Sequence, residues 1–222
     1  MTRNDQLSMF TEPLLAGDRR RCFALVEEWE QQQLPDELLY NDILIPALAQ
    51  VGTGWEENSQ SIVSEHIATQ IVKQVLAYKA FRGKPAARNG KKALIGCVPN
   101  EYHDVASTIL ANILEREGWE VYHYGNSVPT HDILQSASAL QPDLVCFTMK
   151  SVGSMEVTEQ LLRDLRALLP STRVMIGGLH MPGLRAVLAP FVDKFADSFG
   201  DGTDYARSIA AQPSRIASEG SR

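Results

Sequence analysis

Three small groups of residues in the second half of the chain have side chains that could hold a ligand. Glu101 and His103 follow one apolar run, Thr148 lies in another, and Gly177-Gly178 follow a third. A neutral imidazole is a common metal ligand, and a nearby carboxylate can accept its other ring N–H and fix the tautomer. Taken singly, each group is more ordinary: a loop histidine, a local hydrogen bond and a turn. Their interpretation therefore depends on where the fold places them.

The pattern around these groups predicts strands that alternate with helices. The expected strands are residues 93–98, 120–124, 144–149, 173–176 and a short 194–196, and the expected helices are 105–117, 132–140, 157–169 and 205–211. Such alternation is typical of an α/β, flavodoxin-like fold with a doubly wound, parallel five-stranded sheet. Ligands of these folds bind beyond the carboxyl ends of the strands, which is where all three groups lie.

Residues 6–80 carry a different pattern, which predicts an all-α four-helix bundle. Gly17-Asp18 can end one helix and cap the next, and Ser61 can cap the last helix. Pro46 lies inside the third helix and is expected to kink it. The last helix is expected to carry an apolar stripe made of Ile67, Ile71 and Val75.

The remaining segments complete the expected organisation. Residues 81–91 contain many turn-forming residues without periodicity, which predicts a linker. The α/β domain is expected to span residues 92–212. Residues 213–222 are expected to form a disordered tail.

The composition narrows the class of protein. The chain is 44% hydrophobic and 22% charged, with a net charge of −6, which argues against sequence-independent binding to nucleic acid. No apolar run approaches the ~18 residues of a membrane span, and the N-terminus does not resemble a secretory signal, so a cytoplasmic location is expected. The three arginines at 19–21 are interpreted as a solvated helix face. The cysteines are expected to be small buried side chains: Cys22, Cys97 and Cys146.

Together, the three groups resemble the signature of proteins that bind cobalamin in the base-off, His-on form. The chain reads Glu101-x-His103-x-x-Ala106, then 41 residues, Thr148-x-Lys150, 26 residues and Gly177-Gly178. The family pattern is an acidic residue, x, His, x, x, Gly, followed at similar spacings by Ser-x-Leu or Ser-x-Val and by Gly-Gly. The resemblance covers the whole second half of the chain.

This resemblance implies a role for each residue. His103 would coordinate cobalt in place of the cofactor's own dimethylbenzimidazole, and Glu101 would hold the other ring nitrogen of His103. Thr148 would hydrogen-bond the displaced benzimidazole. Gly177 and Gly178 would let the nucleotide tail lie directly on the backbone.

Two residues depart from the family pattern. Ala106 replaces a glycine, and its methyl group would crowd the rim of the corrin. Lys150 replaces a leucine or valine and would place a charge near the expected tail pocket. These departures leave open the affinity and the identity of the bound tetrapyrrole, with haem and a bilin as the other candidates.

The bundle carries a second resemblance, to cobalamin-dependent photoreceptor regulators. Trp55 is followed by nine residues and then by Glu65-His66, as in that family. The resemblance implies that Trp55 covers the upper face of the corrin beside the adenosyl group, and that Glu65 and His66 flank the same pocket. Light would break the cobalt–carbon bond, and the pocket would rearrange. Alternatively, Trp55 is a core aromatic, and His66 is a capping residue or an upper ligand after photolysis.

The predicted function is a cobalamin-binding light sensor that is not an enzyme, with adenosylcobalamin as the expected form. Because the bundle begins within the first ten residues, we expect no DNA-binding domain and no direct DNA binding. The expected partner is a transcription regulator or another effector protein, without membrane association, and a homo-oligomer is compatible with this function.

Two alternatives remain open at this point. One is a sensor of another tetrapyrrole, a bilin or haem, and the other is a corrinoid carrier of a methyltransferase system. The other histidines of the second half are interpreted as structural or exposed: His123, His131 and His180.

Overall fold

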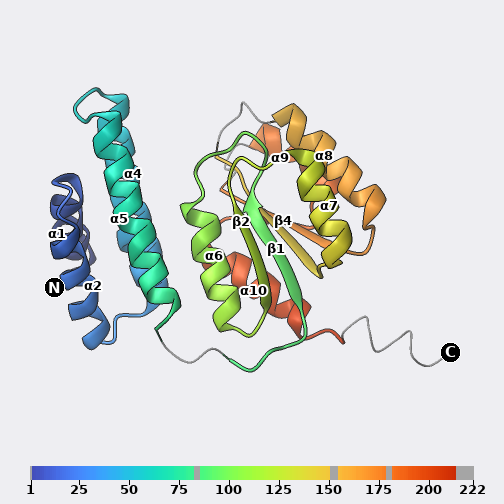
Figure 1. Ribbon diagram of the computed structural model, residues 1–222, viewed down its shortest axis with the longest axis horizontal. Helices are drawn as coiled ribbons and strands as arrows, with labels where there is room; N and C mark the ends of the chain where they lie inside the picture. The colour runs from blue at the N-terminus through green and yellow to red at the C-terminus, as the bar shows by residue number, and fades with distance from the viewer. Residues whose placement is uncertain (1, 83–85, 151–154, 179–181, 214–222) are drawn as a thin grey trace. The chain divides into compact units, whose positions relative to one another are not determined.

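The computed structural model describes residues 2–82, 86–150, 155–178 and 182–213 (Figure 1). The chain divides into two compact units, Met1–Gly83 and Lys84–Arg222. The first unit is helical and the second is an α/β sheet domain, so both halves of the predicted fold class are confirmed. Each unit is described below by itself.

The first unit contains four helical stretches. They are α1 (Arg3–Leu15), α2 (Arg19–Gln31), a third made of α3 (Asp36–Leu38), η1 (Leu39–Leu44) and α4 (Ile45–Glu56), and α5 (Ile62–Ala80). The predicted caps are present: the Asp18 side chain accepts from the Arg21 amide at 3.0 Å, and the Ser61 hydroxyl accepts from the Ser64 amide at 3.0 Å. Satisfied amides at these ends explain why α2 and α5 begin at these residues.

Two details of the bundle differ from the expectation. The six residues before α4 form a π-helical turn, η1, and Pro46 is the second residue of α4. A proline lacks the amide donor and crowds the preceding turn, and a π segment gives that turn more room. Of the predicted apolar stripe of α5, Ile71 and Val75 are buried, but Ile67 is 45% exposed and is not part of the core.

The second unit has five parallel strands in the order β2-β1-β3-β4-β5. The strands are β1 (Lys92–Cys97), β2 (Glu120–Gly125), β3 (Leu144–Thr148), β4 (Arg173–Gly177) and β5 (Lys194–Ala196). The helices are α6 (Val105–Arg116), α7 (Thr130–Leu140), α8 (Met155–Leu168), α9 (Pro182–Leu188), the short η3 (Ala189–Phe191) and α10 (Phe199–Ala210). The strand order reverses between β1 and β3, so this pair forms the topological switch point.

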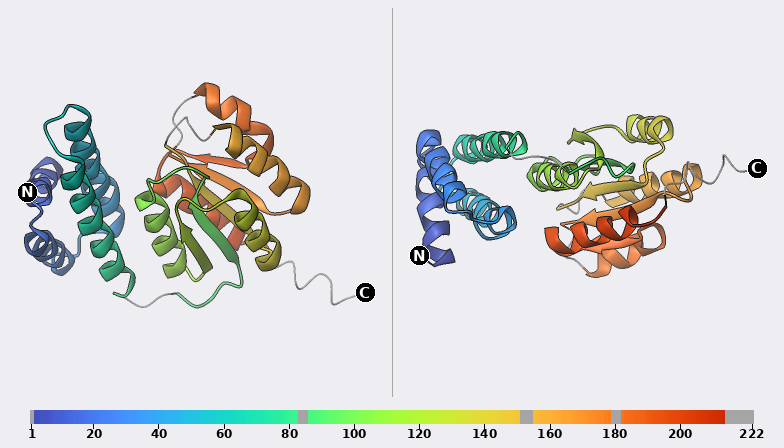
Figure 2. Two further views of the ribbon diagram at one scale, coloured as in Figure 1. Left: turned by 45° about the horizontal axis from the view of Figure 1, so that its top comes forward. Right: turned by 90° about the horizontal axis from the view of Figure 1, so that it is seen from below.

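Helices cover both faces of the sheet (Figure 2). Helices α6 and α10 pack on one face, where the core includes Ile95 and Leu114. Helices α7, α8 and α9 pack on the other, where it includes Phe147 and Leu162. All three cysteines are buried, as predicted. No described helix has the length and apolar content needed to span a membrane.

The segments around the domain differ in part from the expectation. Residues 86–91, within the expected linker, are hydrogen-bonded to the second unit: the Ala86 amide donates to the Arg116 carbonyl at 2.8 Å, and the Asn89 amide donates to that of Gly118 at 2.9 Å. Helix α9 was not predicted, and α10 begins at Phe199 rather than near residue 205. From residue 214 onward, the expected tail lies outside the described residues.

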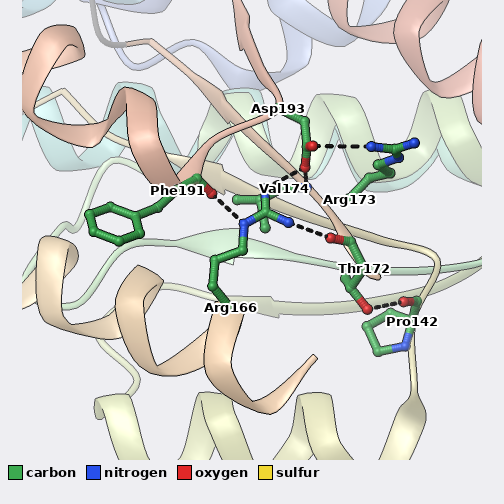
Figure 3. Close-up of polar contacts among 7 residues, drawn as sticks. All are labelled: Pro142, Arg166, Thr172, Arg173, Val174, Phe191 and Asp193. Atoms are coloured by element: carbon green, nitrogen blue, oxygen red, sulfur yellow. Dashed lines mark hydrogen bonds and ion pairs between the residues drawn. The ribbon is translucent and has the colours of Figure 1, made fainter. Parts of the chain in front are cut away.

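A polar cluster lies at the amino edge of the sheet, by which we mean the side on which the parallel strands begin; the carboxyl edge is the side on which they end (Figure 3). The Arg166 guanidinium donates to the carbonyls of Phe191 and Thr172, each at 2.8 Å, and to the Asp193 carboxylate at 2.5 Å. Asp193 also accepts from the Val174 amide at 2.7 Å and from Arg173 at 3.2 Å. Burial alone would raise the pKa of Asp193, but the hydrogen bonds from Arg166 and Val174 lower it below its ordinary value. This cluster joins α8 to the starts of β4 and β5.

Candidate functional site

Glu101 and His103 form a tightly fixed pair just beyond β1. The Glu101 carboxylate is buried, and its Oε1 lies 2.5 Å from His103 Nδ1. The same oxygen accepts from the backbone amides of Tyr102 at 2.9 Å and His103 at 3.0 Å. The His103 side chain is 59% exposed, and no hydrogen bond to its Nε2 is found among the described residues. An ionised Glu101 places the ring proton on Nδ1, which leaves the Nε2 lone pair available as a ligand.

The second oxygen of Glu101 reaches the neighbouring strand of the switch point. Its Oε2 accepts from the backbone amide of Lys150 at 2.8 Å. One buried carboxylate therefore ties the loop after β1 to the end of β3 and holds His103 at the point where parallel sheets bind ligands. The sequence did not reveal this contact, because it depends on which strands are neighbours.

Thr148 lies at the carboxyl end of β3, in register with Cys97 on β1 and Gly177 on β4. Its hydroxyl lies 3.3 Å from Cys97 Sγ, and the residue is only 7% exposed. Burial raises the pKa of the Cys97 thiol to about 11, so the thiol stays protonated at neutral pH. The structure therefore places Thr148, Cys97 and Gly177 side by side at one edge of the sheet.

The two glycines at the carboxyl end of β4, Gly177 and Gly178, differ in whether a side chain could be added. Gly178 has φ +82, and a Cβ there would come within 3.1 Å of the Met149 carbonyl oxygen. At Gly177 an added Cβ would meet no atom within 4 Å among the described residues. The backbone conformation thus favours glycine at 178, whereas the described residues leave space beside Gly177 for a bound group.

The two departures from the family pattern are placed differently. Ala106 is half-buried in the first turn of α6. The side chain of Lys150 is exposed, so its charge is not buried in the sheet. The contact of Lys150 with the Glu101–His103 pair is made by its backbone amide.

One neighbouring contact was missed by the sequence reasoning. Ser107 Oγ donates to the Asp104 carbonyl at 2.8 Å and lies 3.1 Å from His123 Nε2. His123 thus has the structural role expected for it, since it joins β2 to the start of α6. His131 is exposed, as expected, and His180 lies outside the described residues.

The predicted site residues of the bundle belong to the first unit. Trp55, near the end of α4, is 46% exposed, so it is not a core aromatic. Glu65 Oε2 lies 2.8 Å from His66 Nδ1, and Glu65 Oε1 accepts from the Thr69 hydroxyl at 3.0 Å. The His66 side chain is 71% exposed. An exposed aromatic and an exposed, carboxylate-bound imidazole are therefore both available to contact a ligand or partner.

The donor set fits a metal that arrives already held by a macrocycle. Among the described residues, no group of three or more His, Cys, Asp and Glu side chains is arranged to hold a bare ion. A corrinoid carries its cobalt in four ring nitrogens, so the protein needs to supply only an axial ligand and contacts to the periphery. Among the described residues, His103 with Glu101 has the chemistry of an axial ligand, and the edge formed by Thr148 and Gly177 has polar and backbone groups for peripheral contacts.

Comparisons with known protein families agree with this donor chemistry. Residues 91–209 match a family model described as a B12 binding domain, and residues 7–79 match a second model with the same description. The solved monomethylamine corrinoid protein of Methanosarcina barkeri superposes with a TM-score of 0.77, covering 94% of this chain and 100% of that one. At 16% identity, this likeness shows the fold alone.

Two curated relatives represent two kinds of protein. The chain is 30% identical over 155 residues to the HTH-type transcriptional repressor CarH of Myxococcus xanthus, covering 69% of this chain and 51% of the repressor. It is 23% identical over 207 residues to dimethylamine corrinoid protein 1 of Methanosarcina mazei, covering 90% of this chain and 89% of that protein. The chain therefore spans about half the length of the repressor and most of the corrinoid protein.

Proposed function

The chain belongs to the B12-binding domain family and binds a corrinoid, and from that premise we propose that it is a light-sensing regulatory protein rather than an enzyme. The proposed cofactor is adenosylcobalamin, held base-off with His103 as the lower ligand of cobalt. When bound, it supplies a cobalt–carbon bond that visible light can break.

The observation that carries the cofactor part of this proposal is the Glu101–His103 pair. A carboxylate with 1% exposure holds Nδ1 of an imidazole that is itself 59% exposed. Such a carboxylate fixes the tautomer and the ring orientation and raises the basicity of the ligating nitrogen. Glu101 is in turn fixed by three backbone amides, so the imidazole is oriented before any ligand arrives.

The other proposed contacts receive the tail of the cofactor. The Thr148 hydroxyl is proposed to hydrogen-bond the displaced benzimidazole, an exchange that requires its contact with Cys97 to adjust. Gly177 and Gly178 are proposed to contact the nucleotide through the backbone, and the open space beside Gly177 supports this role.

The bundle is the reason to prefer a sensor over a carrier. Trp55, Glu65 and His66 are proposed to cover the upper axial group, where a methyl donor or acceptor would otherwise need access. The exposure of Trp55 supports this role, since a core aromatic could not contact a ligand. Losing the upper group would remove packing against Trp55 and shift the bundle between states. The output is proposed to be a change in binding to a regulatory protein partner or in self-assembly.

Adenosylcobalamin titration in the dark and under green light tests this function. We expect a stable dark complex whose absorption spectrum and size-exclusion elution both change on illumination. Trp55→Ala should bind the cofactor normally but show a smaller elution change, because the upper group no longer packs against an aromatic. Phe81→Ala removes another exposed aromatic of the same unit and serves as the matched control. An unchanged light response in Trp55→Ala contradicts the covering role.

A second candidate function is a corrinoid carrier for methyl transfer. It is favoured by the match to dimethylamine corrinoid protein 1, which extends over nearly the full length of both chains. A carrier would bind methylcobalamin and exchange its methyl group with a methyltransferase in the dark, and its elution would not respond to light. The illumination experiment therefore separates the two functions. A protein that binds no cobalamin but binds haem or a bilin would contradict both.

A further inference from the structure

A groove lies on the surface of the bundle between the start of α2 and the length of α5. Its volume is about 570 Å³, and its lining includes Arg19, Arg20, Val63, His66, Ile67 and Ile71. All of its lining residues belong to the first unit, and α2 and α5 are neighbours in that unit (Figure 1). Neither the Glu101–His103 pair nor the sheet contributes to it.

The floor of the groove is apolar and unusually open. Val63 is 62% exposed and Ile67 is 45% exposed, whereas Ile71, at the inner end of the same row, is 3% exposed. These residues follow one another at four-residue intervals, so they form one stripe on α5. From Val63 to Gln74, the groove extends along about three helical turns, or roughly 16 Å.

The rim of the groove carries two arginines, Arg19 and Arg20, beside the carboxylate of Asp18. Arg19 and Arg20 line the groove, both are exposed, and neither makes an ion pair with another described residue. Arg19 donates only a long hydrogen bond, 3.4 Å, to Gln74. Asp18 also lines the groove, but its Oδ1 accepts from the Arg21 amide as the cap of α2. In a chain with a net charge of −6, the groove therefore combines two exposed cations and one carboxylate with exposed apolar side chains.

We propose that this groove docks an acidic amphipathic helix of a partner protein. The stripe from Val63 to Ile71 would receive apolar side chains at positions i, i+4 and i+7 of that helix, and the arginine rim would pair with its flanking carboxylates. The length of the groove fits a helix of about three turns. A nucleic acid fits less well, because the floor is apolar and the chain as a whole is acidic.

His66 gives this groove a physical connection to the proposed cofactor site. It lines the groove and its Nδ1 is held by Glu65 at 2.8 Å. A cofactor-dependent movement of His66 would therefore alter the groove, and this coupling rests on the proposed function. The docking itself does not, since every residue of the groove belongs to the bundle.

Charge reversal at the rim separates docking from folding. Arg19→Glu combined with Arg20→Glu places carboxylates in the first turn of α2, where the helix dipole favours negative charge, so the variant should fold. Arg3→Glu combined with Arg163→Glu makes the same change in net charge at exposed sites outside the groove and serves as the matched control. Val63→Gln combined with Ile67→Gln removes the apolar stripe at two exposed positions.

The probe is a fluorescent synthetic helix of four turns with leucines on one face and glutamates beside them. A second peptide has lysines in place of the glutamates. Fluorescence anisotropy is measured with the full chain, without cofactor and at low salt, so the result does not depend on light sensing. We expect the acidic peptide to bind about tenfold more tightly than the basic one, with the preference shrinking as salt screens the rim.

The variants decide whether the groove is the site. The double arginine variant should lose the preference for the acidic peptide or reverse it, and the double glutamine variant should weaken binding by about tenfold. The Arg3 and Arg163 control should bind like the unmodified chain. Equal binding of the two peptides, or a preference that survives charge reversal at Arg19 and Arg20, would overturn the proposal.

Discussion

The two edges of the parallel sheet are both rich in polar side chains, but they use them differently. At the amino edge, Arg166 and Asp193 direct their donors and acceptors at one another and at nearby backbone. At the carboxyl edge, Glu101 is satisfied in the same way, yet the imidazole that it holds points to solvent with 59% exposure. At the amino edge the polar side chains bind one another, whereas at the carboxyl edge they orient an imidazole that is free to coordinate a metal.

This difference separates residues that stabilise the fold from residues that we propose to bind a cofactor. In a cluster whose donors and acceptors bind one another, no hydrogen-bonding group is left for a ligand. Substituting a member of such a cluster should therefore reduce only the stability of the protein. A buried carboxylate that orients an exposed imidazole should matter mainly for binding. Both edges pair a carboxylate with a basic side chain. Substitutions are nevertheless expected to lower the stability at the amino edge and the cofactor affinity at the carboxyl edge.

The largest effect is expected at the amino edge. Asp193→Ala removes the acceptor for Arg166, Arg173 and the Val174 amide, and should lower the free energy of unfolding by about 3 kcal/mol. Thermal and urea unfolding measure this change, and cobalamin affinity at a permissive temperature should stay unchanged. Asp204→Ala removes an exposed carboxylate paired with Arg207 and should cost less than about 1 kcal/mol. A large loss of cofactor affinity in Asp193→Ala would contradict the division between edges.

His103→Ala is the mirror-image variant at the carboxyl edge. It should weaken corrinoid binding roughly 100-fold while leaving the unfolding curve of the protein without cofactor nearly unchanged, because the side chain is mostly exposed. Isothermal titration calorimetry and thermal unfolding measure the two quantities. The control is His131→Ala, which removes an 84% exposed imidazole from α7. Equal affinity of both variants would remove His103 from the site.

Glu101→Gln should have an intermediate effect. A glutamine has one acceptor oxygen, whereas the Glu101 carboxylate accepts from three backbone amides and from His103 with two oxygens. The imidazole should lose its fixed orientation, and the affinity for cobalamin should fall about tenfold. Glu115→Gln, on the exposed side of α6, is the control in the same titration. An affinity equal to that of the unmodified chain would show that His103 needs no orienting partner.

The smallest expected effect is the acid sensitivity of the amino edge. The pKa of Asp193 is lower in the folded state than in the unfolded chain, so its contribution is fully present above the unfolded pKa of about 3.9. As the pH falls below that value toward the folded pKa, the contribution is lost. Urea unfolding from neutral to acidic pH should show a shallower decline for Asp193→Ala than for the unmodified chain. Identical slopes would mean that other carboxylates account for the acid sensitivity.

Much of the fold follows from local signals in the sequence. The strands were predicted to within about one residue, because short apolar runs ended by glycine or polar residues are strong signals of buried parallel strands. Helix α9 was missed because it is short and begins with Pro182-Gly183, two residues that usually mark turns. The start of α10 was missed because Gly200 and Gly202 are poor helix formers. The first turn is nevertheless capped, since the Ser198 hydroxyl accepts from the Asp201 amide.

The site was only partly predictable, because its geometry depends on strand order. The resemblance to the cobalamin-binding signature already implied that Glu101 holds the ring of His103. The tie from Glu101 to the Lys150 amide exists only because β1 and β3 are neighbours. The apolar spacing of α5 predicted a stripe of Ile67, Ile71 and Val75. The structure buries Ile71 and Val75, whereas Ile67 lies nearer the start of the helix and is 45% exposed.

Electron paramagnetic resonance of the bound, one-electron-reduced cobalamin tests the ligation by His103 most directly. The unpaired electron of cobalt couples to the nucleus of an axial nitrogen, so protein grown on histidine with the heavier stable nitrogen isotope reports whether that nitrogen comes from the chain. We predict that this labelling changes the hyperfine pattern of the unmodified chain and of His131→Ala, and that His103→Ala loses the isotope-sensitive pattern. A pattern that is insensitive to labelled histidine, or that persists in His103→Ala, would contradict the account.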